Sequence, residues 1–279
     1  MRVAVTGSSG FIGRHVVRQL AARRGIDVIA IARHPDASIS PSVTPVELDI
    51  GADNAHMYDS IGRPDVLLHL AWSGLPDYRA ATHLESELPR QIGFLDACVN
   101  AGLRRLVVAG TCLEYGMQSG CLDESLRTAP ITAYGQAKDR LREHLDACVA
   151  ADGLQLAWAR LFYLYGPGQA PTSLYSQLRT AVEAGATEFP MSPGDQQRDF
   201  LPIDAAAAYL CALALEAPDA GVVNVCGGTA KPVVSWARAW LSEWGADLTL
   251  KLGVYPYPEY EPHAFWGSTM KLHSLLGTP

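Results

Sequence analysis

The alternation of short apolar runs with longer amphipathic stretches is the feature that most constrains the fold of this chain. Runs rich in β-branched and other apolar residues predict strands at 3–6, 27–32, 44–48, 65–71, 105–110 and 154–161. The stretches between them predict helices at 12–24, 81–101 and 132–151. Elements that alternate in this way form βαβ units with parallel strands. We therefore expect an α/β fold with a Rossmann-type doubly wound parallel sheet.

The sequence changes in character after Gly166. The stretch YGPGQAPTS is rich in turn-forming residues, and the segments after it mix predicted helices at 173–184, 204–216 and 232–243 with a short strand at 222–226. We expect a dinucleotide-binding domain at 1–165, to which a segment at about 198–226 returns. A smaller α/β substrate-binding domain is expected at 166–279, and the proline-rich stretch at 255–262 is expected to form an extended loop or lid.

The overall charge argues against nucleic acid as a partner. The 279 residues carry a formal net charge of −7, and the lysines and arginines are scattered rather than clustered. No apolar run approaches the roughly 20 residues of a membrane span, so we expect a cytoplasmic protein without a membrane partner. The six cysteines lie in separate segments without C-x-x-C or paired histidine spacing, which predicts neither a disulfide framework nor a metal site.

A glycine-rich turn follows the first predicted strand. Residues 5–13 read VTGSSGFIG, with three glycines at three-residue spacing between a strand and a helix. Glycine lets backbone N–H groups approach a pyrophosphate, and the helix N-terminus supplies partial positive charge. The turn therefore predicts dinucleotide binding. We expect the cofactor to contact Gly7, Ser9, Gly10, Phe11, Ile12, Arg33, Asp49, Ile50, Leu70, Ala71, Tyr134 and Lys138.

The end of the second predicted strand bears on which dinucleotide binds. A carboxylate there would bond the ribose hydroxyls of NAD, but this chain has Ala32, Arg33 and His34. A guanidinium attracts the 2′-phosphate of NADP, so NADP(H) is favoured and NAD is the alternative. Asp49, after the third predicted strand, either bonds the adenine amine or caps the following turn.

The stretch YGQAK at 134–138 carries a second chemical signature. On a helix, Tyr134 and Lys138 lie one turn apart on the same face. A free tyrosine has a pKa near roughly 10. A nearby ammonium is expected to lower that pKa by stabilising the phenolate, which gives a group that exchanges protons with a sugar oxygen.

The chain resembles the extended short-chain dehydrogenase/reductases of the sugar-nucleotide epimerase and dehydratase family. The motifs that carry the resemblance are TGSSGFIG, HLAW, GTCLEYG, YGQAK, RLFYLYGPGQ and RDFLPID, and they cover nearly the whole length. The resemblance implies that Thr111 holds the C4 oxygen of the substrate, that Tyr134 donates or accepts the proton, and that Lys138 also grips the nicotinamide ribose. It also implies a homodimer formed through the helices near 81–101 and 132–151.

The residues after Thr111 narrow the chemistry. In the 4,6-dehydratases of the family an acid and a base stand there, whereas this chain has Cys112 and Leu113. Glu114 lies one position too far along and is expected, on an extended stretch, to point to the other face. Hydride transfer at one carbon is left, and similarity to reductases of dTDP- or CDP-4-keto-6-deoxyhexoses favours an NADPH-dependent 4-ketoreductase. The alternatives are a 4-epimerase with retained NAD and a non-catalytic NADP-sensing regulator.

The resemblance also implies a nucleotide-diphosphate sugar as the substrate. Arg198 of RDFLPID is expected to contact the diphosphate, or otherwise to pair with Asp199 or Asp204. Tyr163 stands where the family commonly has an asparagine that contacts the sugar nucleotide. The expected substrate-binding residues are Trp72, Cys112, Tyr163, Arg198 and Asn224. His69, inside an apolar strand, is expected to be a hydrogen-bonded structural residue.

Overall fold

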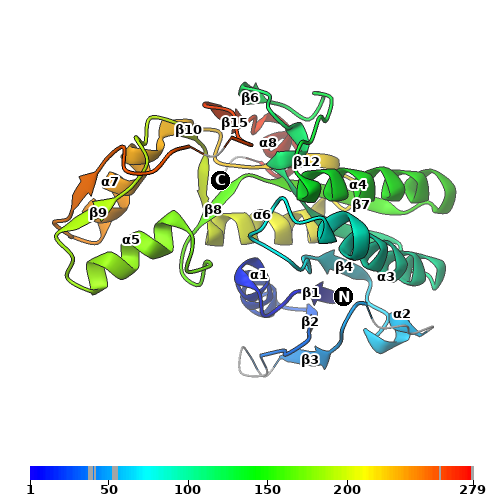
Figure 1. The fold of residues 1–279 in the computed structure, drawn as a ribbon. Helices are drawn as coiled ribbons and strands as arrows, with labels where there is room; N and C mark the ends of the chain where they lie inside the picture. The colour runs from blue at the N-terminus through cyan, green and yellow to red at the C-terminus, as the bar shows by residue number, and fades with distance from the viewer. Residues whose placement is uncertain (37–39, 41, 52–55, 258, 278–279) are drawn as a thin grey trace.

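A seven-stranded parallel sheet forms the centre of the molecule (Figure 1). The computed structural model describes residues 1–36, 40, 42–51, 56–257 and 259–277. The order of the strands across the sheet is β3-β2-β1-β4-β5-β7-β12, and each neighbouring pair is parallel. These strands are β1 (Arg2–Thr6), β2 (Asp27–Ala32), β3 (Val43–Glu47), β4 (Val66–His69), β5 (Arg105–Thr111), β7 (Gln155–Leu161) and β12 (Gly221–Val225).

Helices cover both faces of this sheet. One face packs against α1 (Phe11–Ala21), α6 (Ile203–Glu216) and α8 (Met270–Leu276), and the other against α2 (Met57–Ser60), α3 (Leu88–Asn100) and α4 (Ala133–Asp152). Side chains alternate between the two faces along each strand. In β1, for example, Val3 and Val5 belong to the first core and Ala4 to the second. The expected Rossmann-type sheet is confirmed.

The sheet has a topological switch point between β1 and β4. The chain runs outward from β1 to β2 and β3 on one side, and from β4 to β5, β7 and β12 on the other. The connections therefore diverge at the carboxyl ends of β1 and β4, which opens a crevice where ligands of such folds bind. The glycine-rich turn follows β1 at this crevice.

Most of the chain after β7 builds a smaller lobe. In Figure 1 the helices α5 (Leu174–Glu183) and α7 (Val233–Glu243) lie apart from the seven-stranded sheet, beside β9 (Glu188–Pro190). Leu178 of α5 and Trp240 of α7 share a core with Phe189 and Met191. The lobe includes short strand pairs made from β8 (Tyr163–Tyr165), β10 (Gln197–Arg198), β11 (Phe200–Pro202), β13 (Lys231–Pro232) and β14 (Thr249–Lys251).

Two further short strands, β6 (Gly120–Leu122) and β15 (Phe265–Gly267), pair with each other next to β12 (Figure 1). The sequence pattern did not predict them, because three-residue strands are too short to show an alternation. None of the helices in the described part of the chain has the length and apolarity needed to cross a membrane.

Candidate active site

The glycine-rich turn leaves no room for side chains. A Cβ on Gly13 would lie 2.1 Å from the carbonyl oxygen of Gly7, and one on Gly7, whose φ is +67°, would lie 2.9 Å from the backbone nitrogen of Ala71. The turn thus lies against the end of β4, and α1 begins after Gly10, which has no side chain to cap the first N–H groups. An uncapped helix N-terminus in a glycine cradle fits a dinucleotide pyrophosphate.

A cavity extends from this turn along the ends of β1 to β4. It is lined by Thr6, Gly7, Ser9, Gly10, Ile31, Ala32, Arg33, His34, Leu48, Asp49, Ile50, Ala71, Trp72, Ser73, Glu87 and Arg90, and we call it the cofactor cavity. Arg33 and Asp49, both expected from the sequence, lie on its wall. Arg90 of α3 donates to Asp49 across 2.6 Å. The backbone N–H of Gly51 and the Arg90 charge hold the pKa of Asp49 below its usual value.

His69, at the end of β4, holds the side chain of Thr6 next to the glycine-rich turn. Its ring is fully buried between Thr6 Oγ1, 2.9 Å from Nδ1, and Gln91 Oε1, 2.5 Å from Nε2. Thr6 Oγ1 also accepts the backbone N–H groups of Leu70 and Ala71. Burial lowers the pKa of His69 to about 3, so the imidazole is neutral. The expected structural role is confirmed, and Leu70 contributes its backbone there rather than a wall of the cofactor cavity.

Thr111 ends β5 and caps the turn that follows. The residues Cys112–Tyr115 form a 3-10 helix, so the expectation of an extended stretch at Glu114 is wrong. Thr111 Oγ1 accepts the N–H of Leu113, and Glu114 Oε1 accepts the N–H of Thr111 at 2.8 Å, which completes a capping box. This reciprocal pair fixes the Thr111 backbone at the carboxyl edge of the sheet.

The carboxylate of Glu114 is fully buried, which the sequence analysis did not predict. It accepts Arg160 Nε at 2.6 Å and Trp158 Nε1 at 3.0 Å, both from the adjacent strand β7. Burial raises the pKa of Glu114, and the Arg160 charge opposes that shift. Sequence reasoning missed this pair. The available signal was Arg160, a charge inside the apolar predicted strand at 154–161, since buried charges need partners.

Tyr134 and Lys138 enter the site from the first turns of α4. Thr132 caps that helix through the N–H of Gly135, and the N–H of Tyr134 donates to the carbonyl of Tyr78. The Tyr134 ring lies 5.7 Å from that of Tyr78 and 5.6 Å from that of Trp72, measured between centroids. The helix therefore delivers the phenol and the ammonium side by side, as their spacing predicted.

The electrostatics of this pair differ from the sequence expectation. Desolvation raises the pKa of Tyr134 instead of lowering it, because the phenol is buried among aromatic rings. Burial likewise lowers the pKa of Lys138 to about 7. Lys138 Nζ donates to the carbonyl of Ala109 at 2.8 Å and lies 3.9 Å from the centroid of the Trp72 ring. The ammonium is thus held by a carbonyl and a π-face.

Trp72 was expected among the substrate residues, but the structure places it elsewhere. Its ring lines the cofactor cavity and packs on Lys138 and Tyr134. Its Nε1 donates to His83 Nδ1 at 3.1 Å, and His83 Nε2 lies 2.7 Å from the carbonyl of Asp77. His83 is fully buried, and no sequence motif indicated its role in holding Trp72.

Thr111 and Tyr134 open onto a second cavity, which we call the Thr111 cavity. It is lined by Phe11, Ile12, Leu75, Tyr78, Gly110, Thr111, Cys112, Leu113, Tyr134, Leu161, Phe162, Tyr163, Leu164, Gln169 and Glu261. Phe11 and Ile12, expected at the cofactor, thus face this side. Burial raises the pKa of the Cys112 thiol, so it stays protonated. Glu114 is absent from the wall, and among the described residues Glu261 supplies the single carboxylate there.

An outer cavity of about 620 Å³ adjoins the Thr111 cavity, since Tyr78, Tyr163, Leu164, Gln169 and Glu261 line both. Pro76 adds to the wall from the first part of the chain, and the rest comes from the smaller lobe with aromatic, aliphatic and neutral polar side chains, among them Ser173, Gln177, Phe189, Phe200, Tyr255 and Tyr260.

Arg198 lies buried behind this wall. Its Nη2 donates to Glu261 at 2.9 Å, and the side chains are 3% and 11% exposed. The expected alternative partners of Arg198 are therefore wrong: Asp199 accepts N–H groups of Gly227 and Gly228, and Asp204 pairs with His15. No sequence motif identified Glu261 as the partner of Arg198, because the two residues lie 63 positions apart.

Asn224 is not brought to either cavity. It is fully buried in β12, where Nδ2 donates to the carbonyl of Leu122 and Oδ1 accepts the hydroxyl of Tyr115. These bonds tie β12 to the turn after Thr111 and to β6. The expectation that Asn224 lies beside the substrate does not hold, because its side chain is fully buried and bonds to Leu122 and Tyr115 within the protein. Tyr163, by contrast, lines both the Thr111 cavity and the outer cavity.

Comparisons with known proteins bear on this site. The chain is 28% identical, over 96% of its own length and 100% of the relative, to a dTDP-6-deoxy-L-talose 4-dehydrogenase (NAD(+)) of Aggregatibacter actinomycetemcomitans. It is 28% identical to a UDP-glucose 4-epimerase of Azospirillum brasilense, covering 76% of this chain and 68% of the relative.

Among solved structures, MoeE5 in complex with UDP-glucuronic acid and NAD superposes with a TM-score of 0.83 at 28% identity, covering 99% of this chain and 93% of that one. The profile of the NAD dependent epimerase/dehydratase family matches residues 3–226. That match spans the glycine turn, nearly all of the seven-stranded sheet and the residues Thr111, Tyr134 and Lys138, and the chain therefore belongs to the NAD dependent epimerase/dehydratase family.

Proposed function

We propose that this protein reduces the C4 ketone of a nucleotide-linked 4-keto-6-deoxyhexose, with NADPH as the reductant. The observation that carries the proposal is the wall of the Thr111 cavity. It offers the hydroxyls of Thr111 and Tyr134, while a protonated thiol and an aliphatic side chain, Cys112 and Leu113, occupy the positions of a dehydratase acid and base. The named activity of the Aggregatibacter relative, dehydrogenation at C4 of a deoxysugar nucleotide, is the same chemistry in the oxidative direction.

The side chains of the site support acid catalysis at the C4 oxygen. NADPH, when bound along the glycine turn, supplies the hydride. Thr111 and Tyr134 donate hydrogen bonds to the ketone oxygen, and the Tyr134 phenol delivers the proton as the alkoxide forms. Lys138 then stabilises the phenolate that is left, and since its pKa is about 7 it also exchanges protons near neutral pH.

The preference for NADPH rests on the charges at the end of β2. Arg33 lies on the wall of the cofactor cavity, and no acid stands at the strand end. The one aspartate on that wall, Asp49, is already paired with Arg90. The name of the Aggregatibacter relative specifies NAD(+), and MoeE5 is in complex with NAD, so the two cofactors must be compared directly by titration.

We assign the sugar to the Thr111 cavity and the nucleotide to the adjoining outer cavity. The aromatic walls of the outer cavity suit a nucleobase, since rings stack on rings. On this assignment residues 1–165 hold the cofactor and residues 166–279 supply most contacts to the nucleotide.

Turnover by Tyr134→Phe tests the proposal. Purified protein is mixed with NADPH and dTDP- or CDP-linked 4-keto-6-deoxyhexoses, and loss of the nicotinamide absorbance is followed. We expect the variant to lose about 10²- to 10⁴-fold in rate, the usual worth of a general acid, while binding NADPH normally. Tyr165→Phe, a phenol of the smaller lobe outside the cavities, is the matched control. Unchanged turnover in Tyr134→Phe refutes the assignment.

A 4-epimerase is the second candidate, favoured by the Azospirillum relative and by the same three reactive groups. Incubation of the protein with nucleotide hexoses, without added cofactor, separates the two. Interconversion of C4 epimers identifies an epimerase, and NADPH consumption identifies a reductase. Silence in both assays, with NADPH binding intact, points to the regulator.

A further inference from the structure

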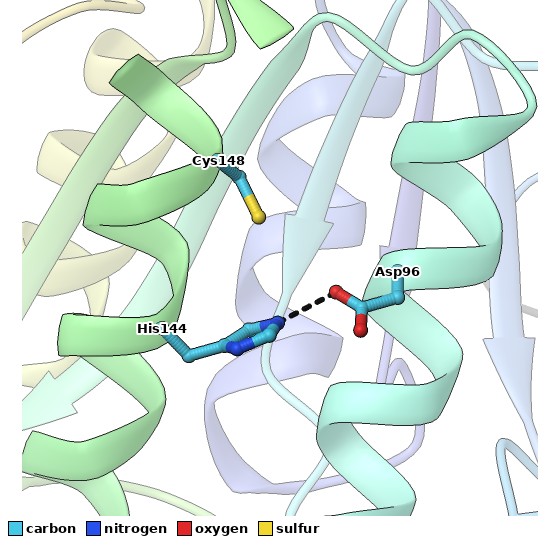
Figure 2. Close-up of side chains that lie close together, drawn as sticks. All are labelled: Asp96, His144 and Cys148. Atoms are coloured by element: carbon cyan, nitrogen blue, oxygen red, sulfur yellow. Dashed lines mark hydrogen bonds and ion pairs between the residues drawn. The ribbon is translucent and has the colours of Figure 1, made fainter. Parts of the chain in front are cut away.

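Three side chains with different donor atoms meet on the outer surface of α3 and α4. His144 and Cys148 lie one turn apart on α4, and Asp96 faces them from α3. Figure 2 shows all three side chains directed into the space between the two helices. His144 Nε2 lies 2.7 Å from Asp96 Oδ1, and the three donor atoms all lie within 4.8 Å of one another. None of them lines the cavities described above.

The spacing is close to that of a tetrahedral metal centre. Zinc holds thiolate sulfur at about 2.3 Å, imidazole nitrogen at about 2.0–2.1 Å and carboxylate oxygen at about 2.0–2.2 Å, which separates the donors by about 3.3–3.6 Å at tetrahedral angles. The pair of His144 and Asp96 would open by roughly half an ångström, and Cys148 would approach by about one. We expect rotation of the three side chains to supply both movements.

The surroundings also favour a cation. Asp96 contributes one carboxylate to the cluster, and Asp152, a second acidic residue, lies one helical turn beyond Cys148 on α4. A divalent ion between the donors would bind the Cys148 sulfur as the thiolate. The nearest arginine on the helix, Arg142, is paired with Asp139 and Asp146. The side chains of His144 and Asp96 are 34% and 37% exposed in the single chain.

We propose that Asp96, His144 and Cys148 bind a zinc-class divalent cation, with water in the fourth position. The bound ion links α3 to α4 across 48 residues of sequence and so stabilises the helix pair. The cysteine spacing had predicted no metal site, because the third ligand comes from another helix and leaves no motif. The competing description is a surface ion pair between His144 and Asp96 with an unrelated cysteine beside it.

Titration of the metal-stripped full chain with Co²⁺ decides between them. A Cys148 thiolate on cobalt gives a near-ultraviolet sulfur-to-metal charge-transfer band, and tetrahedral cobalt gives intense visible bands. We expect both bands to saturate at one ion per chain, to vanish on addition of Zn²⁺, and to persist in Cys121→Ser, which removes another exposed cysteine.

Cys148→Ser is expected to lose the charge-transfer band, and His144→Gln to weaken binding at least tenfold, with thermal melts confirming that both variants are folded. The absence of a charge-transfer band in the wild type at millimolar Co²⁺, or its survival in Cys148→Ser, overturns the proposal. Visible bands without the sulfur band overturn it as well, because they place the ion on other ligands.

Discussion

Removal of the Glu114 charge should destabilise the protein more than any other single isosteric change near the site. In Glu114→Gln the side chain keeps one oxygen acceptor, and an NH₂ group replaces the second carboxylate oxygen. The carboxylate now accepts the N–H of Thr111 and one Trp158 bond on Oε1, and the Arg160 and second Trp158 bonds on Oε2. A glutamine must therefore turn its NH₂ group toward a donor, either Arg160 or Thr111, and leave the Arg160 charge without a counterion.

The size of the effect follows from the burial of both partners. The side chains of Arg160 and Glu114 are 3% and 0% exposed, so water cannot replace the lost partner. Loss of one member of a buried pair costs about 3–5 kcal/mol. At roughly 2–4 °C per kcal/mol for a chain of this size, the melting temperature should fall by about 6–20 °C.

The assay is denaturant unfolding of Glu114→Gln, Arg160→Met and the double variant. Because the double variant buries neither charge, its cost should be smaller than the sum of the single costs by about 2 kcal/mol or more. Additive costs, or a loss below about 1 kcal/mol in Glu114→Gln, would show that the pair does not hold the Thr111 turn.

Three further outcomes are expected. Lys138→Met should stabilise the fold more at pH 6 than at pH 9, because burial holds the pKa of Lys138 at about 7. Below that pH the folded protein bears the whole cost of burying the charged amine, and this cost shrinks by about 2–3 kcal/mol by pH 9. A pH-independent difference between the thermal melts of the two proteins would contradict this. Arg33→Ala should weaken NADPH about tenfold and leave NADH unchanged, as followed by fluorescence titration; equal losses would place Arg33 away from the 2′-phosphate. Glu261→Gln should free Arg198 and tighten dTDP about tenfold by calorimetry; weaker binding would make Glu261 itself a ligand.

The sheet and its glycine turn could be predicted from the sequence because both rest on local patterns. Buried strands read as apolar runs, and the constraint at Gly13 acts between residues six apart. The spacing of Tyr134 and Lys138 was sufficient to place them on one helix face for the same reason. Their catalytic roles are predictions that turnover measurements must test.

The features that escaped prediction join segments far apart in the chain. Glu114, in the 3-10 helix after β5, meets Arg160 of β7 across 46 residues, and Arg198 meets Glu261 across 63 residues. The pKa of Tyr134 was also misjudged, because its value depends on how deeply neighbouring rings bury the phenol, and one-turn spacing from a lysine says nothing of that. Desolvation is a property of the assembled core and leaves no trace in a short motif.

The pairing of Arg198 with Glu261 has a consequence for recognition. Glu261 already accepts a hydrogen bond from the Arg198 guanidinium, so an anion that bound Arg198 as proposed would have to compete with a carboxylate that the fold holds in place. Small free anions have only their charge with which to compete. A ligand that also fills the outer cavity gains binding energy from contacts with its aromatic walls. Glu261 would therefore make displacement from Arg198 depend on the shape of the ligand as well as on its charge.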